Sequence, residues 1–257
     1  MTGLDHRLRG PEGAPVLVLS SSLGTTQELW ERQLPGLVGH FRVLTYDHPG
    51  HGASDLPKQR PTVESLARSL VTLLDELRLE RVSLCGVSLG GMVGMTLALE
   101  EPERVDRLVL ACTSAHLGPR EGWEERARAV RAHGMEAVAD TVVERWFTPD
   151  FARTESETVA RFRTMLASTP PEGYARCCEA LAAWDARERI SAISASALVV
   201  AGADDPATPM EHSELLASSI PSARLSVLER AAHLANVERA AVFTSAVLEH
   251  LGQEAPV

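Results

Sequence analysis

The chain has 257 residues, of which 44% are hydrophobic and 23% charged, and its formal net charge is −10. This composition indicates a globular protein with a sizeable core and excludes a chain that would stay unfolded for lack of apolar residues. The acidic charge argues against nucleic-acid binding, which needs basic side chains to neutralise phosphates. No apolar run approaches the roughly 20 residues that cross a bilayer, so we expect no membrane association.

Two further features bear on location and metal binding. The N-terminal ten residues lack the apolar core of a secretory signal, so we expect a cytoplasmic protein. The four cysteines show no metal-ligand spacing, and we interpret them as reduced thiols: Cys85, Cys112, Cys177 and Cys178.

Short apolar runs alternate with longer amphipathic ones along the chain. The short runs predict strands buried on both faces at 16–20, 42–47, 81–87, 106–112, 197–202 and 224–229. The longer runs predict helices over about 27–38, 62–78, 89–100, 210–219 and 236–250. In the second of these, leucines at helical spacing should face the sheet: Leu66, Leu70, Leu73, Leu74 and Leu77. The alternation predicts the α/β class, with a mostly parallel central sheet flanked by helices.

The interval from 117 to 190 breaks this alternation. It contains no strand-like run, only helical patterns rich in Arg, Glu and Ala. Ordinary crossovers between strands are much shorter. We therefore expect a helical cap over 117–190, inserted into a core made of 1–116 and 191–257.

The stretch VSLCGVSLGG, residues 82–91, places Ser88 between two glycines. The pattern G-x-S-x-G is weak on its own, because a chain of this length contains one by chance about one time in ten. Here a buried-type strand ends at Val87 and a helix should begin near Leu89, so the serine lies on a sharp turn that exposes its hydroxyl. We predict that Ser88 is a nucleophile; the alternative is a plain glycine-rich turn.

A serine nucleophile needs a base and an acid that orients the base. In this arrangement both should follow the serine, at the ends of later strands. The run ALVVAGADDPATP ends a strand in Asp204 and Asp205, and AAHLANVE places His233 after the last strand. We take His233 as the base. Either aspartate can be the acid; we favour Asp205, which would make Asp204 a turn residue. The other eight histidines lie elsewhere, and we interpret them as structural or solvated.

Ester cleavage puts negative charge on the carbonyl oxygen, and losing one backbone N–H donor to that oxygen costs about 3 kcal/mol in the transition state. We expect one donor at Leu89, which follows the nucleophile at a helix N-terminus. The loop SSSLGT, residues 20–25, should supply the second at Leu23. The alternative for this loop is a simple polar turn.

Taken together, these motifs resemble the α/β-hydrolase superfamily over nearly the whole chain. YDHPGHGAS (46–54) is similar to its D-x-x-G-H-G-x-S loop, and the match to GADDPATP (202–209) puts the acid at Asp205. Within the superfamily the chain is most similar to 3-oxoadipate enol-lactonases. Their motifs are matched by SLGT (22–25) with Trp30, and by segments 42–54, 86–94, 103–110 and 201–209. Departures occur at His48–Pro49, where an arginine often precedes the glycine, and at Ser21, where asparagine is frequent.

The resemblance implies hydrolysis of β-ketoadipate enol-lactone to 3-oxoadipate through an acyl-Ser88 intermediate, with no metal or organic cofactor. Alternatives are a carboxylesterase, a carbon–carbon bond hydrolase or a cofactor-free perhydrolase of the same fold, and a non-catalytic ligand receptor. A decarboxylase of the same pathway is a possible fused or separate partner.

The implied substrate is a small anion, so positive charge should lie near the pocket although the chain is acidic. The cap offers many arginines, most of them expected to pair with nearby acids. As substrate contacts we name Ser22, Trp123, Trp146 and Arg131; for the tryptophans the alternative is a place in the cap core.

Overall fold

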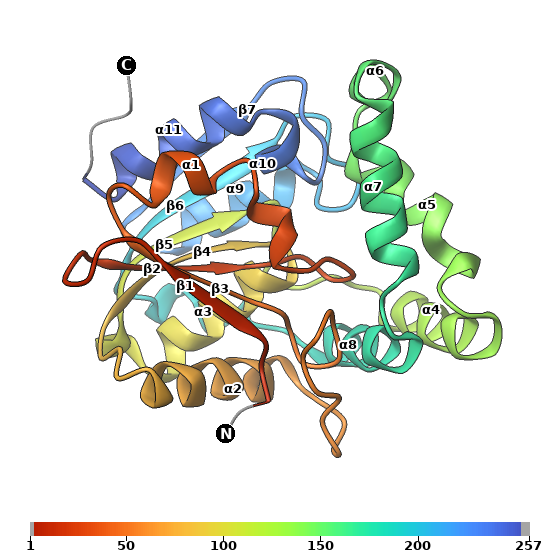
Figure 1. The fold of residues 1–257 in the computed structure, drawn as a ribbon, viewed down its shortest axis with the longest axis horizontal. Coiled ribbons are helices and arrows are strands. Elements are labelled where there is room, and N and C mark those ends of the chain that lie inside the picture. Colours follow the sequence, from red (N-terminus) through yellow and green to blue (C-terminus); the bar gives the residue numbers. More distant parts are fainter. Residues whose placement is uncertain (1–2, 253–257) are drawn as a thin grey trace.

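The computed structural model describes residues 3–252, and a single sheet runs through the middle of this part of the chain (Figure 1). Its order is β1-β3-β2-β4-β5-β6-β7, with β1 antiparallel to β3 and the other neighbours parallel. The strands are β1 His6–Arg9, β2 Val16–Ser20, β3 Arg42–Tyr46, β4 Val82–Val87, β5 Val105–Ala111, β6 Ser196–Gly202 and β7 Ala223–Leu228. Because β2 to β7 are parallel, their carboxyl ends lie at one edge of the sheet, where ligands of open α/β sheets bind.

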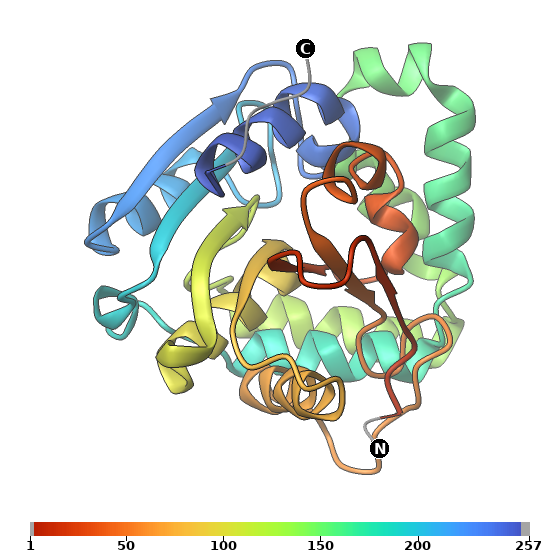
Figure 2. The same cartoon turned by 60° about the vertical axis from the view of Figure 1, so that its left-hand side comes forward.

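Helices cover both faces of this twisted sheet. Figure 2 shows α2 (Val63–Glu76) on one side of the strands and α11 (Ala240–His250) on the other. Helix α3 (Leu89–Glu100) packs against β2, β4 and β5 and is buried from Leu89 to Ala98, as its almost wholly apolar sequence requires. The remaining core elements are η1 Gln27–Trp30, α1 Leu34–Leu37, η2 Pro102–Arg104, η3 Ile190–Ala192, α9 Met210–Ser219 and α10 Ala235–Glu238.

The α/β class predicted from the sequence is confirmed, and each expected strand is present to within about one residue. Strand β1 was missed because its four residues, HRLR, are mostly polar and lie at the sheet edge. The helix expected over 27–38 is broken into η1 and α1, and the one over 236–250 divides at Arg239. Of the five leucines expected to face the sheet, Leu77 is only half-buried, since it caps the end of α2.

Five α-helices lie between β5 and η3 in the sequence, and we call them the cap helices: α4 Arg120–His133, α5 Glu136–Trp146, α6 Pro149–Thr154, α7 Ser156–Ala167 and α8 Pro171–Ala183. They stand at one end of the sheet rather than on its faces (green to teal in Figure 1), with α4 against α8 and α5 against α7. Helix α8 meets the core through two glycines, since a Cβ on Gly173 would lie 2.0 Å from the carbonyl oxygen of Gly50. The domain boundaries at 117 and 190 stay a prediction.

Two classes of feature are lacking in residues 3–252. No helix there has the length and apolar character needed to span a membrane. No group of three or more His, Cys, Asp or Glu side chains there is arranged to hold a metal ion. The four cysteines are free and buried.

Candidate active site

Ser88 lies on the tight turn between β4 and α3. Its backbone has φ 55° and ψ −116°, a conformation that residues other than glycine rarely adopt. The turn is held from both sides, because the Ser88 N–H donates to the Ala111 carbonyl at 2.9 Å and the Thr113 hydroxyl donates to the Ser88 carbonyl at 2.7 Å. The end of β5 therefore fixes this strained residue.

The glycines on either side of Ser88 are required by close backbone approach. A Cβ on Gly86 would lie 2.3 Å from the carbonyl carbon of Gly90, and a Cβ on Gly90 would lie 2.0 Å from the carbonyl oxygen of Ser20. Both distances are far inside van der Waals contact, so neither position accepts even alanine without displacement of the backbone.

Asp205 and His233 come from the loops that follow β6 and β7. The His233 Nδ1–H donates to Asp205 Oδ2 at 2.9 Å, an assignment that leaves Nε2 to accept a proton. The same carboxylate accepts the Thr208 hydroxyl at 2.5 Å and the N–H groups of Ala207 and Thr208 at 2.8 and 3.1 Å. Burial acts to raise the pKa of Asp205, but His233 and the Thr208 hydrogen bonds outweigh it and hold that pKa below its usual value. Asp205 is thus an ionised, fixed partner for the imidazole.

Asp204 lies apart from this pair. Its N–H donates to the Ala231 carbonyl at 2.9 Å, and it lines a separate, open cavity of about 670 Å³ that contains neither Ser88 nor His233. Of the two adjacent aspartates, the structure therefore brings Asp205 to the histidine.

Ser88 and His233 line the same small cavity, of about 70 Å³, under the cap helices. Among the predicted substrate contacts, Ser22, Trp123 and Trp146 also line it. The other lining residues are Leu23, Leu117, Arg126, Val142, Arg145, Tyr174, Ala207 and Thr208. The cavity thus combines the predicted nucleophile and base with an apolar and cationic wall from the cap.

Leu23 and Leu89 are placed next to the nucleophile. Leu89 begins α3, so its N–H has no partner within the helix. Leu23 lines the cavity in the turn after β2, and its N–H donates to no acceptor in residues 3–252. The following residue, Gly24, is held by His51, whose Nε2 accepts the Gly24 N–H at 3.1 Å.

The prediction that Arg131 contacts the substrate is not supported, because its guanidinium lies outside the cavity between two carboxylates. It pairs with Glu172 at 2.7 Å and Glu179 at 2.5 Å on the cap surface. Two other cap arginines, Arg126 and Arg145, line the cavity, and neither forms an ion pair within residues 3–252.

Aromatic side chains adjoin these two arginines. The Arg126 guanidinium lies 4.6 Å from the centre of the Trp123 ring. The buried Tyr174 hydroxyl lines the same cavity, near Arg126, and donates its proton to no acceptor among the described residues. The sequence carried a signal for both arginines, since Arg126 is one helical turn after Trp123 and Arg145 adjoins Trp146.

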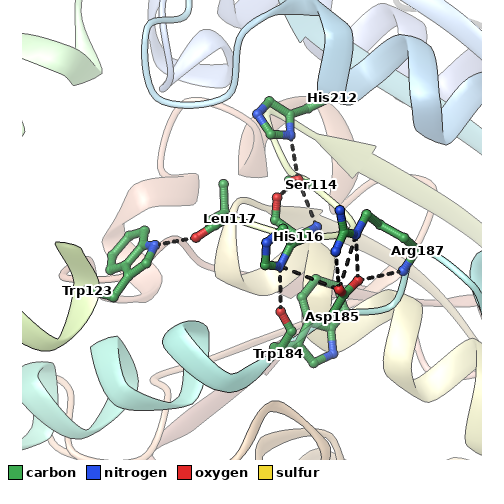
Figure 3. A network of polar contacts seen from close by, with 8 residues as sticks. All are labelled: Ser114, His116, Leu117, Trp123, Trp184, Asp185, Arg187 and His212. Carbon is green, nitrogen blue, oxygen red and sulfur yellow. Dashed lines mark hydrogen bonds and ion pairs between the residues drawn. The ribbon is translucent and has the colours of Figure 1, made fainter. Parts of the chain in front are cut away.

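A second serine–histidine contact occurs at the base of the cap helices (Figure 3), where Ser114 Oγ and His212 Nδ1 are 2.6 Å apart. The Ser114 hydroxyl donates to the His116 carbonyl at 2.7 Å and accepts the His116 N–H at 3.0 Å. Its one proton is thereby used, so His212 must donate, and both lone pairs of the oxygen are occupied. Ser114 is therefore a structural residue and does not compete with Ser88.

This network joins the two chain segments that enter and leave the cap helices. The Ala186 N–H donates to the Ala115 carbonyl at 2.9 Å, and His116 Nδ1 donates to the Trp184 carbonyl at 3.2 Å. Asp185 is in turn held by Arg187 at 2.5 Å. The base of the cap helices is thus pinned together.

Comparisons with known proteins show the family of this chain. A model of the alpha/beta hydrolase fold family matches residues 15–240. The chain is 38% identical to 3-oxoadipate enol-lactonase 2 of Acinetobacter baylyi, over 95% of this chain and 91% of that protein. It is 33% identical to the putative carbamate hydrolase RutD of Stutzerimonas stutzeri, over 94% and 93%.

Among solved structures, the enol-lactonase from Burkholderia xenovorans LB400 superposes with a TM-score of 0.95 at 40% identity, covering 97% of this chain and 96% of that one. A thermophilic esterase from Thermogutta terrifontis superposes with a TM-score of 0.91 at 30% identity, covering 97% and 93%. A serine on a strained strand–helix turn, an Asp–His pair at the ends of later strands and a family match across most of the chain agree with one another: this protein belongs to the alpha/beta hydrolase fold family.

Proposed function

We propose that this protein is a serine hydrolase that opens the lactone ring of β-ketoadipate enol-lactone to give 3-oxoadipate. One observation carries the proposal: Ser88 and His233 share a small cavity with two arginines that have no carboxylate partner in residues 3–252. The 35–38% identity to two enol-lactonases of Acinetobacter baylyi supports the choice of substrate.

In the first half of the reaction, His233 Nε2 takes the Ser88 proton as the serine oxygen attacks the lactone carbonyl. The negative charge that forms on the carbonyl oxygen is stabilised by the N–H groups of Leu23 and Leu89. Asp205 holds the imidazole in the required tautomer and stabilises its charged form. The carbonyl–ring oxygen bond then breaks, His233 returns the proton to the leaving enolate, and the enol tautomerises to the ketone on the acyl chain attached to Ser88.

In the second half, water displaces the Ser88 oxygen from the acyl carbonyl. His233 takes a proton from the water, which attacks the acyl carbonyl, and the same two N–H groups stabilise the second oxyanion. The Ser88 oxygen leaves with the proton from His233. One lactone and one water thus give one 3-oxoadipate, and the enzyme is regenerated.

The arginines in the cavity explain how an acidic protein would select an anionic lactone. A carboxylate on the substrate would pair with Arg126 or Arg145 and accept a hydrogen bond from the buried Tyr174 hydroxyl, whose proton otherwise has no acceptor in residues 3–252. Burying such a hydroxyl unpaired is costly, so a polar group of the ligand fits here.

A second candidate is hydrolysis of an uncharged ester or of a carbamate by the same residues. The similarity to the putative carbamate hydrolase and to the thermophilic esterase favours it. A neutral substrate would leave the cavity arginines without a counter-charge, so charge dependence separates the two candidates.

The test compares freshly generated enol-lactone with an aryl acetate and a simple carbamate. We expect rapid lactone turnover, slow turnover of the neutral compounds, and at least about a 10⁴-fold loss in Ser88→Ala. Arg126→Gln should raise KM for the lactone about 10- to 100-fold, because a charge-assisted pair is lost, and leave the aryl acetate reaction unchanged.

The matched control is Arg128→Gln, which removes an exposed arginine from the same helix and should behave as wild type. Faster turnover of the aryl acetate or carbamate than of the lactone would reject the proposed substrate. Full activity of Ser88→Ala would reject the mechanism.

A further inference from the structure

The last residue of α5 and the turn before α6 are hydrogen-bonded to the loop that carries His233. The Leu234 N–H, directly after the histidine, donates to the Trp146 carbonyl at 2.9 Å. The Ala232 N–H, directly before it, donates to Glu238 Oε1 at 3.3 Å. Both backbone neighbours of His233 are therefore anchored.

Glu238 connects this loop to the cap helices. Its Oε1 also accepts the Thr148 N–H at 2.7 Å, and its Oε2 accepts the Thr148 hydroxyl at 2.9 Å. Thr148 is the N-cap of α6 and lies two residues after Trp146, which lines the catalytic cavity. One half-buried carboxylate thus bonds both the cap segment 146–148 and the residue preceding His233.

We propose that Glu238 is a positioning residue that sets His233 opposite Ser88 when the cap helices close over the cavity. Within residues 3–252 the His233 side chain has one hydrogen-bond partner, Asp205, which fixes its tautomer. Where the imidazole lies also depends on its backbone, and that backbone is tied through Glu238 and Trp146 to the cap segment.

The size of the cavity makes this connection consequential. Its volume of about 70 Å³ is well below the roughly 300–1,000 Å³ of ordinary ligand sites, which favours movement of the cap helices when a lactone enters. When segment 146–148 moves, its bonds to Glu238 and Leu234 must break or carry the His233 loop with them. Re-forming them on closure restores the geometry that proton transfer needs, in which small displacements are costly.

Variants at the two ends of the contact test the proposal. Thr148→Val removes the hydroxyl and keeps the shape, whereas Thr148→Ser keeps the hydroxyl; Glu238→Gln replaces one acceptor oxygen by a donor. We expect Thr148→Val and Glu238→Gln to lower kcat about tenfold or more with KM within about twofold, and Thr148→Ser to match wild type. Two exposed matched controls, Glu229→Gln near the same loop and Thr154→Val on α6, should leave kcat unchanged.

Hydrogen exchange by mass spectrometry supplies a readout that needs no turnover. In Glu238→Gln, exchange should become faster in the peptides covering 146–152 and 230–238 and stay unchanged in the peptide covering 89–100. Wild-type kcat in both Thr148→Val and Glu238→Gln would overturn the proposal. Equally faster exchange in all three peptides would also overturn it, because that result indicates general destabilisation.

The inference rests on the proposed roles of Ser88 and His233, and an aryl acetate assay separates the two failures. If the Glu238 and Thr148 variants cleave the ester as fast as wild type does, only the positioning role of Glu238 fails. If Ser88→Ala is as active as wild type, both proposals fail.

Discussion

Asp205 accepts hydrogen bonds from His233 Nδ1, the Thr208 hydroxyl and the backbone N–H groups of Ala207 and Thr208. These contacts keep its pKa low in spite of burial, so its ionised form persists through the neutral range. Two adjacent aspartates made the acid ambiguous from spacing alone. The hydroxyl at position 208 is a local signal, because a threonine three residues after an aspartate can close a turn onto that carboxylate and not onto the one before it.

Removing the Thr208 hydroxyl should therefore weaken catalysis through Asp205. In Thr208→Val the carboxylate loses its 2.5 Å partner and keeps the two backbone donors. We expect kcat/KM to fall about tenfold, the equivalent of one hydrogen bond to a charged group, with Thr208→Ser close to wild type. Steady-state kinetics on the lactone measure this, and equal kcat/KM for the valine and serine variants would contradict it.

At the scale of elements, two loops support each other beside the nucleophile. His48 and Ser21, two of the positions that depart from the enol-lactonase pattern, are in contact, since His48 Nε2 donates to the Ser21 carbonyl at 2.9 Å. His51 accepts the Gly24 N–H from the same loop. The His48 contact is to the backbone of Ser21, and segment 48–51 thus fixes the loop that presents Leu23.

Helix α8 reaches the core only because two glycines meet. In Gly173→Ala the new Cβ would lie 2.0 Å from the Gly50 carbonyl oxygen. Helix α8 must therefore shift, and with it Tyr174, the residue after Gly173. We expect unfolding free energy to fall by about 1–3 kcal/mol and KM for the lactone to rise. The control is Gly122→Ala on α4, where a Cβ meets nothing within 4 Å and should stabilise by about 0.5–1 kcal/mol. Urea unfolding distinguishes them; equal stability of the two variants would contradict the steric argument.

For the whole molecule, we expect acid to lower the free energy of unfolding through buried histidines. Burial lowers the pKa of His48 to about 3, helped by repulsion from His51, and lowers the pKa of His51 to about 4. In the unfolded chain both histidines bind a proton below about pH 6.5, whereas in the folded chain they stay neutral until the pH reaches 3–4. The free energy of unfolding is therefore unaffected by the titration of these histidines above about pH 6.5. Below about pH 6.5 it falls by up to about 1.4 kcal/mol per pH unit for each histidine.

Urea unfolding at pH 7.5, 5.5 and 4.5 measures this loss. His51→Gln should reduce the slope of stability against pH, although its stability at pH 7.5 is also lower because the Gly24 contact changes. The depressed pKa of Asp205 adds to this loss only below about pH 4, the pKa of an unfolded aspartate, because its stabilisation disappears as pH falls from there through its folded value. A wild-type stability that does not change between pH 7.5 and 4.5 would contradict the assignment of neutral, buried histidines.

The sequence predicted the sheet because its strands are continuous apolar runs, and it predicted the Asp–His pair because topology brings strand ends together. The contacts among the cap helices could not be predicted from the sequence. Arg126 and Arg131 are five residues apart on α4 and so point about 140° apart, and only the packing of α4 against α8 decides which one meets the cavity. Glu238 was missed for a similar reason, since its partner Thr148 is 90 positions away.

The left-handed backbone at Ser88 has a consequence for how this protein can adapt to heat. Such a conformation costs a side-chain-bearing residue about 1–3 kcal/mol, which glycine would recover. The substitution that best relaxes the fold at this point is thus the one that abolishes the proposed chemistry. Substitutions that raise the thermal stability of this protein therefore have to lie elsewhere in the molecule, and the backbone at Ser88 stays strained.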